Sequence, residues 1–155
     1  MALRIGVISD THGLLRPEAK AFLAGSDHIV HGGDIGNQAI LDELAAIAPL
    51  TVVRGNNDRG VWAEEVPETT LLTVGGVRIY AIHDIAQLDI DPVKEGVGVV
   101  VYGHSHKPVV EHRGAVMYLN PGSAGPRRFS LPISAAEIVI EDSVVNTRVV
   151  DLIER

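Results

Sequence analysis

Five apolar runs of strand length in this chain each end at a short polar segment rich in glycine, aspartate, asparagine or histidine. The runs are LRIGVIS, HIV, LTVVR, VRIYAI and GVGVVVY, and the segments that follow them are Asp10 to His12, His31 to Asp34, Gly55 to Asp58, His83-Asp84 and Gly103 to His106. Near-continuous apolar runs of this length are typical of buried strands. Open α/β sheets bind ligands at the carboxyl ends of their strands. The pattern therefore predicts a sheet-based fold that gathers these polar segments at one edge.

The first part of the chain, up to about residue 68, alternates between strand and helix patterns. Strands are expected over residues 3–9, 28–31 and 50–54, and helices over 17–23 and 37–47. Proline suits the first turn of a helix, as at Pro17, and asparagine suits an N-cap, as at Asn37. This alternation indicates an α/β arrangement.

The remainder of the chain favours β-hairpins. Residues 97–102 form one more buried run, and hairpin turns are expected at Gly75-Gly76, Arg113-Gly114 and Asp142-Ser143. Buried strands followed by hairpins predict an α/β (α+β) fold of two β-sheets packed face to face with helices outside. We expect residues 1–155 to form a single domain.

Composition excludes several classes of function. Hydrophobic residues make up 46% of the chain, and no run approaches the roughly 20 apolar residues that a membrane-spanning helix needs. A net charge of −7 and an aromatic content of 4% argue against general nucleic-acid binding. Cysteine is absent, which fits a cytoplasmic protein. The N-terminal apolar run soon meets Asp10, so it resembles a first strand more than a signal peptide.

Seven side chains in the polar segments are candidate metal ligands: Asp10, His12, Asp34, Asn56, His83, His104 and His106. In an extended segment residues i and i+2 point to the same side, so D-x-H and H-x-H each offer two neighbouring ligands. Glycines before three of the candidates allow close backbone approach. Carboxylate, amide and imidazole donors without thiolate suit Mn²⁺, Fe or Zn²⁺. Seven ligands exceed the needs of one ion and suit two ions that share a carboxylate.

Each segment alone has a simpler interpretation. An isolated D-x-H or G-D pair is usually ordinary turn chemistry, and two histidines at a strand end are often only solvated. His31 is either a residue that orients a ligand or a buried core histidine. The ordered occurrence of all five segments is what favours a metal site.

This ordered set, D-x-H, G-D, G-N-x-D, H and G-H-x-H, resembles the calcineurin-like metallophosphoesterases, from Asp10 to the Asn120-Pro121-Gly122-Ser123 stretch. The resemblance is closest to the small, cap-less bacterial and archaeal phosphodiesterases. It implies a four-layer α-β-β-α sandwich of two mixed sheets flanked by helices. It also implies a hydrolase that cleaves P–O bonds of a small phosphoester.

Carried over to this chain, the resemblance makes Asp10, His12 and His106 ligands of one metal ion. It makes Asn56, His83 and His104 ligands of a second ion, with Asp34 bridging both. The expected cofactors are two divalent ions, with Mn favoured and Fe, Zn, Ni or Mg tolerated. A hydroxide bridging the ions would attack phosphorus in line.

Two positions depart from the pattern. Many relatives have a histidine where this chain has Asn57, and an amide cannot donate a proton to a leaving group. Asn57 and Arg54 are nevertheless the expected catalytic residues, Arg54 by lending charge to the phosphate. Asp84 replaces the glycine that usually follows the histidine at 83, and is an extra ligand, an orienting residue or a turn cap.

Other functions remain open on the sequence. The retromer of eukaryotes contains a scaffold subunit of this fold with a degraded metal site, so a binding module is the alternative to an enzyme. A phosphomonoesterase is the third possibility, with Arg54, Arg127 or Arg128 receiving a dianionic phosphate. The late hairpins also offer strand edges through which copies could pair into a homo-oligomer.

Overall fold

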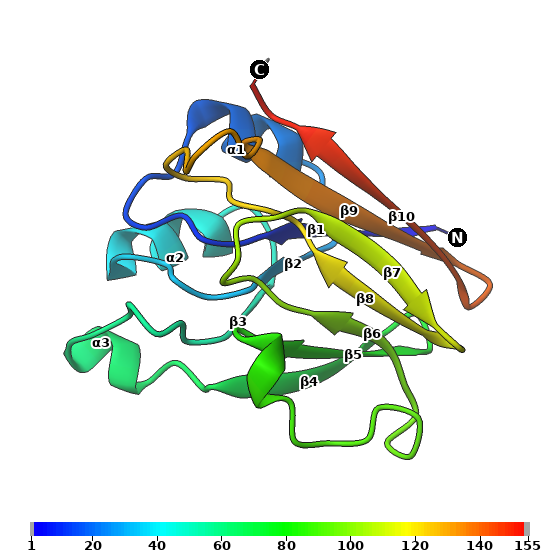
Figure 1. Cartoon of the computed structure of the whole chain (residues 1–155). Helices are drawn as coiled ribbons and strands as arrows, with labels where there is room; N and C mark the ends of the chain where they lie inside the picture. Colours follow the sequence, from blue (N-terminus) through cyan, green and yellow to red (C-terminus); the bar gives the residue numbers. More distant parts are fainter. Residues whose placement is uncertain (1, 154–155) are drawn as a thin grey trace.

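The computed structural model describes residues 2–153, which form two five-stranded β-sheets with short helices (Figure 1). The elements are β1 (Leu3–Ile8), α1 (Pro17–Leu23), β2 (His28–His31), α2 (Gln38–Ala45), β3 (Leu50–Val52), α3 (Val61–Glu64), β4 (Thr69–Val74), β5 (Val77–Ile82), the 3₁₀ turn η1 (Ile85–Gln87), β6 (Val97–Val101), β7 (Val109–Arg113), β8 (Val116–Asn120), β9 (Ser134–Glu141) and β10 (Val144–Asp151).

Both sheets are mixed. The first has the order β10-β9-β1-β2-β3, in which β1, β2 and β3 are parallel and β9 pairs antiparallel with β1. The second has the order β4-β5-β6-β8-β7, with β5, β6 and β8 parallel and the two edge strands antiparallel. The β-α-β-α-β pattern expected over residues 3–54 is therefore confirmed.

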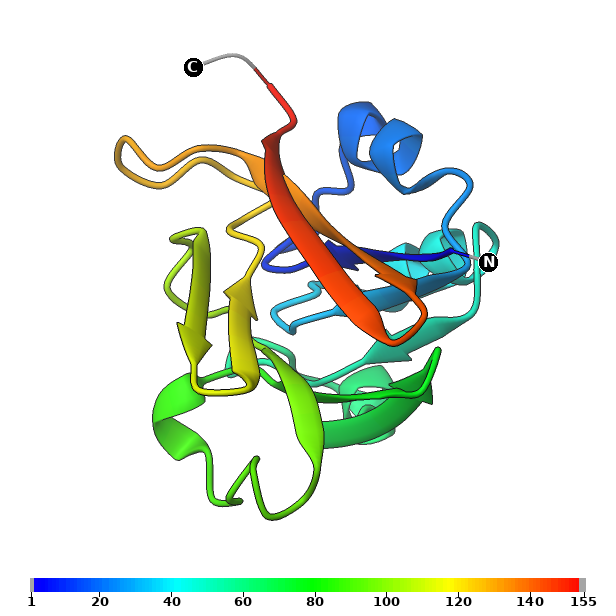
Figure 2. The ribbon, with the colours of Figure 1, turned by 90° about the vertical axis from the view of Figure 1, so that its right-hand side faces the viewer.

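The main apolar core lies between the sheets, where Ile5 and Val7 of β1 meet Val99 and Val101 of β6. A second cluster joins the other face of β1 and β2 to α1 and α2, so these helices cover the outside of the first sheet. Figure 2 shows the first sheet edge-on between α1 and the strands β7 and β8.

The outer face of the second sheet has a thinner cover than the expected helical layer. Tyr80, Tyr102 and Tyr118 line this face, and Ile85 of η1 and Leu88 pack against them. The fourth layer of the sandwich is thus a 3₁₀ turn and its loop. In the described residues no helix is long and apolar enough to span a membrane.

The structure contains the helix cap and the hairpin turns that the sequence predicts, with boundaries shifted by one or two residues. Asn37 caps α2 by accepting a hydrogen bond from the Ile40 N–H at 3.1 Å, although α2 ends at Ala45 instead of residue 47. Gly75-Gly76 and Asp142-Ser143 form the expected two-residue turns, all with positive φ. The third turn lies one residue later than expected, because Arg113 still pairs with Val116 and residues 114 and 115 form the loop.

Candidate metal centre

The polar segments that end β1, β2, β3, β5 and β6 lie together at one edge of the sandwich. Backbone hydrogen bonds join them directly: the Asp10 N–H donates to Gly33 O at 3.0 Å, and the Gly103 N–H donates to His83 O at 3.0 Å. The carboxyl ends of the parallel strands of both sheets meet here, as parallel strands in open sheets require. All seven candidate ligands are therefore in one neighbourhood.

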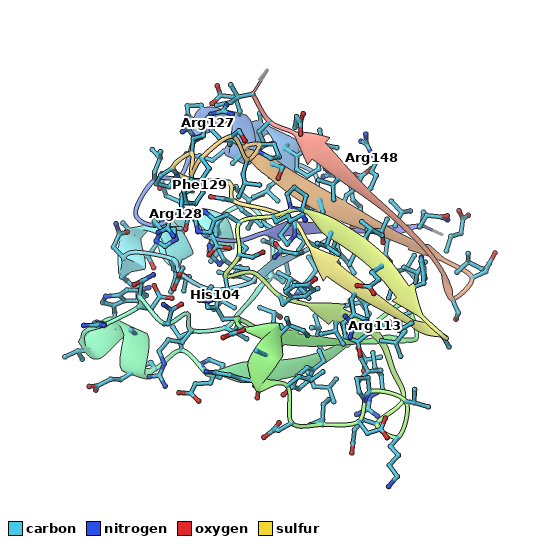
Figure 3. All side chains as sticks on the ribbon, in the orientation of Figure 1. His104, Arg113, Arg127, Arg128, Phe129 and Arg148 are labelled. Carbon is cyan, nitrogen blue, oxygen red and sulfur yellow. The ribbon has the colours of Figure 1, made fainter. Side chains whose placement is uncertain are left out.

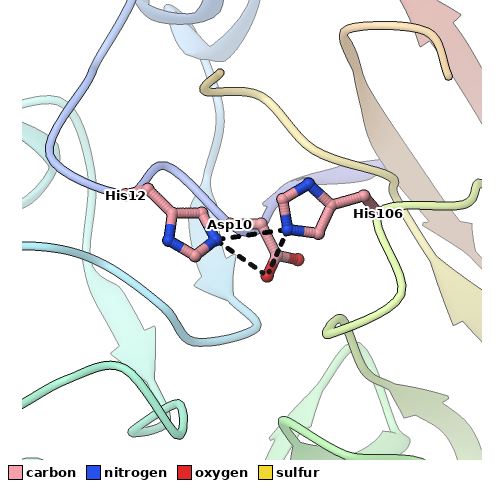
Figure 4. Close-up of side chains that lie close together, drawn as sticks. All are labelled: Asp10, His12 and His106. Atoms are coloured by element: carbon pink, nitrogen blue, oxygen red, sulfur yellow. Dashed lines mark hydrogen bonds and ion pairs between the residues drawn. The ribbon is translucent and has the colours of Figure 1, made fainter. Parts of the chain in front are cut away.

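Asp10, His12 and His106 form one compact group (Figure 4). Asp10 Oδ1 lies 3.7 Å from His12 Nε2 and 3.5 Å from His106 Nε2, and the two Nε2 atoms are 3.2 Å apart. Asp10 and His106 are buried, and the His12 side chain is 16% exposed. Three donor atoms thus converge on one point that solvent can reach from the side of His12.

Asn56, His83 and His104 form a second group. Asn56 Oδ1 lies 3.0 Å from His83 Nε2 and 3.2 Å from His104 Nδ1. Asp34 lies between the groups, with its Oδ2 3.6 Å from His12 Nε2 and 3.3 Å from His83 Nε2. The structure therefore brings all seven side chains together in two sets of three with one carboxylate between them.

The orientation of the His83 ring indicates what can be bound between its Nε2 atom and the neighbouring oxygens. His83 Nδ1 lies 2.7 Å from Gly32 O, and because a carbonyl only accepts, Nδ1 carries a hydrogen. In the neutral ring the Nε2 lone pair then faces the oxygens of Asn56 and Asp34. Facing lone pairs repel, so a proton or a cation must sit between them. An imidazole fixed through its other nitrogen is a common feature of metal-binding histidines.

Asp10 Oδ1 gives a second, independent indication. It is buried and has no hydrogen-bond partner among the described residues, although two imidazole nitrogens lie within 3.7 Å. An isolated buried carboxylate oxygen is strongly unfavourable unless it is paired or coordinates a metal. The other oxygen, Oδ2, is satisfied by the Ser9 hydroxyl at 2.8 Å and the His104 N–H at 3.2 Å. The residues present fit a cation held at Oδ1.

The electrostatics of Asp34 and His83 agree with this fit. Burial by itself raises the pKa of Asp34, but hydrogen bonds from His83 and Asn57 outweigh it and hold the pKa well below its usual range. Burial by itself lowers the pKa of His83, and the neighbouring carboxylates of Asp34 and Asp10 reverse the shift, so the pKa is raised. A fixed negative charge at Asp34 thus attracts positive charge between the two groups.

Five of the candidate ligands have left-handed backbone conformations, with φ of 56° at Asp10, 46° at His12, 56° at Asp34, 73° at His104 and 64° at His106. Such conformations are uncommon outside glycine and cost about 1–3 kcal/mol each. The extended-segment argument for D-x-H and H-x-H was therefore wrong in its geometry. Left-handed turns aim these side chains, and His104 and His106 consequently join different groups.

The glycines that precede three candidates are required sterically, as expected. A Cβ on Gly33 would lie 2.6 Å from His83 Nδ1, and one on Gly55 would lie 2.1 Å from Asp34 Oδ1. A Cβ on Gly103 would lie 2.2 Å from Ser9 Oγ. Each glycine lets one segment pack directly on another.

The two expected catalytic residues occupy different surroundings. Asn57 donates to Asp34 through its backbone N–H at 2.9 Å and its side-chain amide at 3.0 Å. Arg54 donates to Glu68 at 2.8 Å, so much of its charge is engaged. It lines a cavity of about 340 Å³ that opens beside Asn56 and His83.

Three residues beside the candidate ligands make hydrogen bonds that support the surrounding turns. His31 is buried and hydrogen-bonded, with its Nδ1 accepting from the Gly33 N–H and its Nε2 3.0 Å from the Thr11 hydroxyl. Asp58 accepts hydrogen bonds from the backbone of Ile35, Gly36 and Gly55. Asp84 caps η1 by accepting from the Ala86 N–H. His31 is thus a buried, hydrogen-bonded histidine and Asp84 a turn cap, each of which was one of the alternatives expected from the sequence.

The N-P-G-S stretch also acts as support. Asn120 Nδ2 donates to Gly103 O and Ser105 Oγ, and so fixes the turn that carries His104 and His106. Ser123 Oγ donates to Asp10 O at 3.0 Å.

A sequence profile of the calcineurin-like phosphoesterase superfamily domain matches residues 3–143. A probable metallophosphoesterase of Methanothermobacter thermautotrophicus is 37% identical over 141 residues, covering 83% of this chain and 81% of that protein. A phosphodiesterase of Methanocaldococcus jannaschii is 27% identical over 138 residues, covering 77% of this chain and 83% of that protein.

Solved structures give the same architecture. A predicted phosphoesterase of Streptococcus pneumoniae superposes with a TM-score of 0.75 at 25% identity, covering 98% of this chain and 91% of that one. Vps29 of Chaetomium thermophilum also superposes with a TM-score of 0.75, at 23% identity and 95% coverage of both chains. The second likeness concerns the fold alone.

Proposed function

Because this chain belongs to the calcineurin-like phosphoesterase superfamily, we propose that it is a metal-dependent phosphodiesterase with a dinuclear centre. The observation that carries the proposal is the buried Asp10 Oδ1, which has no hydrogen-bond partner in residues 2–153. A scaffold has no need for an uncompensated carboxylate oxygen, whereas a metal enzyme uses one.

In this proposal Asp10, His12 and His106 hold one divalent ion, and Asn56, His83 and His104 hold the other. Asp34, with atoms 3.6 Å from His12 and 3.3 Å from His83, serves both. Oxygen and nitrogen donors suit Mn²⁺ and also Fe, Zn²⁺, Ni²⁺ or Mg²⁺. When bound, two such ions supply Lewis acidity to the phosphoryl oxygens and an activated water.

The residues of the chain have separate tasks. Asn57 fixes the plane of the Asp34 carboxylate, and Gly32 O fixes the ring of His83. In the reaction a water oxygen bonds to phosphorus, the bond to one ester oxygen breaks, and a monoester and an alcohol are formed. Asn57 cannot release a proton, so the leaving alcohol departs without an acid at this position. Activated aryl diesters are therefore the better substrates.

The alternatives to a phosphodiesterase are a scaffold and a phosphomonoesterase, and an experiment distinguishes the three. The fold is also that of Vps29 of Chaetomium thermophilum, and the first alternative is a non-catalytic scaffold of this fold. A phosphomonoesterase would need a cation free to receive a second phosphate charge, and Arg54 is engaged by Glu68. The substrate proposed here is a small phosphoester in the cytoplasm, with no role for general nucleic-acid binding.

The experiment compares hydrolysis of bis-(p-nitrophenyl) phosphate with that of p-nitrophenyl phosphate by chelated protein to which Mn²⁺ is added back. Metal-restored activity that favours the diester is expected. Activity that favours the monoester would replace the proposal with a phosphatase. No activity with Mn²⁺, Fe²⁺, Zn²⁺, Ni²⁺ or Mg²⁺ would favour the scaffold.

A further inference from the structure

The loop between β8 and β9 is anchored to the segment that carries Asp10 and His12. The Ala124 N–H donates to Ser9 O at 3.0 Å, and the Ser123 hydroxyl donates to Asp10 O at 3.0 Å. Gly125 lies so close that a Cβ on it would be 2.2 Å from Thr11 O. The chain therefore leaves the metal centre at Gly125, and residues 127–130 are exposed directly beyond it.

Arg128 is at the exposed end of this loop. Its side chain makes no hydrogen bond or ion pair with any residue that the structure describes, whereas Arg54 pairs with Glu68. The guanidinium of Arg128 therefore keeps its five donors free.

Phe129 is exceptional among the aromatic residues. The chain has six of them, one Trp, three Tyr and two Phe. Phe22, Trp62 and the three tyrosines all pack in apolar clusters. Phe129 is 93% exposed and has a φ of 53°. The Phe129 ring therefore contributes nothing to the apolar core, and its face is open to a ligand.

The two sides of the centre differ in charge. On the side of Asn56 and His83, the 340 Å³ cavity is lined by Arg54 and by three carboxylates, Glu68, Asp84 and Asp89. On the other side, the loop that packs on Thr11 at Gly125 carries the unpaired guanidinium of Arg128. Figure 3 shows Arg128 and Phe129 on the same side of the molecule as His104, far from Arg113 and Arg148. Anionic phosphate oxygens are therefore attracted toward Arg128.

We propose that Arg128 and Phe129 form the subsite for the ester group that stays on phosphorus, and that this group is a nucleoside. Arg128 donates to a non-bridging phosphate oxygen, and the Phe129 ring stacks on the nucleobase. Every nucleobase has a flat face, so an exposed aromatic ring accepts any of them, and such stacking changes affinity by about tenfold. The inference rests on the proposed phosphodiesterase function and names its substrate class as nucleoside phosphodiesters.

The test uses two diesters with the same charge and leaving group, thymidine 5′-(p-nitrophenyl phosphate) and methyl p-nitrophenyl phosphate, with Mn²⁺-loaded protein. The wild type is expected to have a kcat/KM about tenfold higher for the thymidine ester. Phe129→Ala is expected to bring this ratio close to one, through a higher KM for the thymidine ester. Arg128→Ala is expected to lower kcat/KM for both esters, with partial recovery in Arg128→Lys.

Arg127→Ala is the matched control, because Arg127 is on the same loop and its guanidinium is engaged by Leu131 O at 3.4 Å. It is expected to keep the wild-type ratio. A wild type that hydrolyses both esters without preference, or a Phe129→Ala variant that keeps the preference, would overturn the subsite and leave the phosphodiesterase intact. The same holds if Phe129→Ala alters only the oligomeric state measured by light scattering.

Binding separates failure of the subsite from failure of the function. Thymidine 5′-monophosphate is titrated calorimetrically into the Mn²⁺-loaded wild type and Phe129→Ala. Weaker binding to Phe129→Ala, by about tenfold, supports the subsite even if neither ester is hydrolysed. Equal affinity of the two proteins would overturn it.

Discussion

Asn57 holds both oxygens of Asp34, with its backbone N–H 2.9 Å from Oδ1 and its side-chain amide 3.0 Å from Oδ2. These two bonds fix the plane of the carboxylate that lies between the two candidate groups of ligands. Asn57, which stands where many relatives have a histidine, is therefore hydrogen-bonded to Asp34, the candidate ligand that lies between the two groups. Its first role in the structure is to position Asp34.

Asp34→Asn should reduce diesterase activity more than the loss of any single histidine, by about 10³-fold or more, because the carboxylate serves both proposed ions. Metal content by mass spectrometry should fall from two ions to one or none. Asp84→Asn is the matched control, since Asp84 caps η1 and asparagine can replace it there. A nearly active Asp34→Asn beside an inactive His104→Ala would refute the two-metal assignment.

Asp10→Asn should stabilise the metal-free protein while abolishing binding of the ion assigned to Asp10, His12 and His106. Asn can still accept from Ser9 and His104, and its amide can donate toward the Nε2 atoms where Oδ1 has no partner. Removing an unpaired buried charge should raise the free energy of unfolding by about 1–3 kcal/mol. Thermal unfolding in EDTA and in Mn²⁺ measures both effects. A variant less stable than the wild type in EDTA would show that Oδ1 is compensated without metal.

The stability of the metal-free protein should fall between pH 6.5 and pH 4 because of His31. Burial lowers its pKa from 6.5 to about 4, so in this range the unfolded chain binds a proton that the folded protein excludes. The corresponding loss is about 3 kcal/mol. His31→Asn should be less stable at pH 7 and have a shallower pH dependence. Denaturant unfolding at each pH gives the comparison, and parallel curves would contradict the assignment.

Gly55→Ala should impair metal binding without removing a ligand. Its new Cβ would lie 2.1 Å from Asp34 Oδ1, so the carboxylate must move. Activity should fall by about 10²-fold or more, since displacements of about 1 Å have effects of that size. Gly98→Ala is the control, because its Cβ would meet only the Val77 side chain closely, at 3.1 Å. Similar activities of the two variants would show that the close packing at Gly55 is dispensable.

Turnover should depend steeply on the leaving group because Asn57 cannot act as an acid. Bis-(p-nitrophenyl) phosphate should be hydrolysed at least about 10²-fold faster than diphenyl phosphate, the lower limit of the contribution of a general acid. A series of substituted aryl diesters measures the dependence of kcat on leaving-group pKa. A flat dependence would indicate that another group protonates the leaving oxygen.

The strand-end segments were predictable from sequence because they depend on local patterns. The apolar run before Asp10 is long enough for one strand, and the alternation with helices makes the neighbouring strands parallel. Parallel strands bring their carboxyl ends to one edge, so residues as distant as Asp10 and His106 were expected to meet. The prediction of two sheets came from the buried strands early in the chain and the hairpin turns that follow them.

The geometry within the centre was not predictable in the same way. Left-handed backbone at Asp10, His12, Asp34, His104 and His106 is held by bonds from other segments, such as the one from the Asp10 N–H to Gly33 O. Aspartate and histidine adopt that conformation more often than most residues do, but it is still uncommon for them, so local propensity does not single out these five positions. The layer over the second sheet was likewise decided by packing, because Ile85 of η1 and Leu88 pack against the three tyrosines of its outer face.

The sequence by itself determined which residues lie at the ends of the strands, since hydrophobic periodicity and turn chemistry act over a few neighbouring positions. Only the tertiary structure decided where each side chain points, which oxygen of Asp10 has no partner, and that the loop carrying Arg128 and Phe129 packs on the segment of Asp10 and Thr11. The physical reason is that these features arise from contacts between segments far apart in the chain, and such contacts leave no local pattern in the sequence.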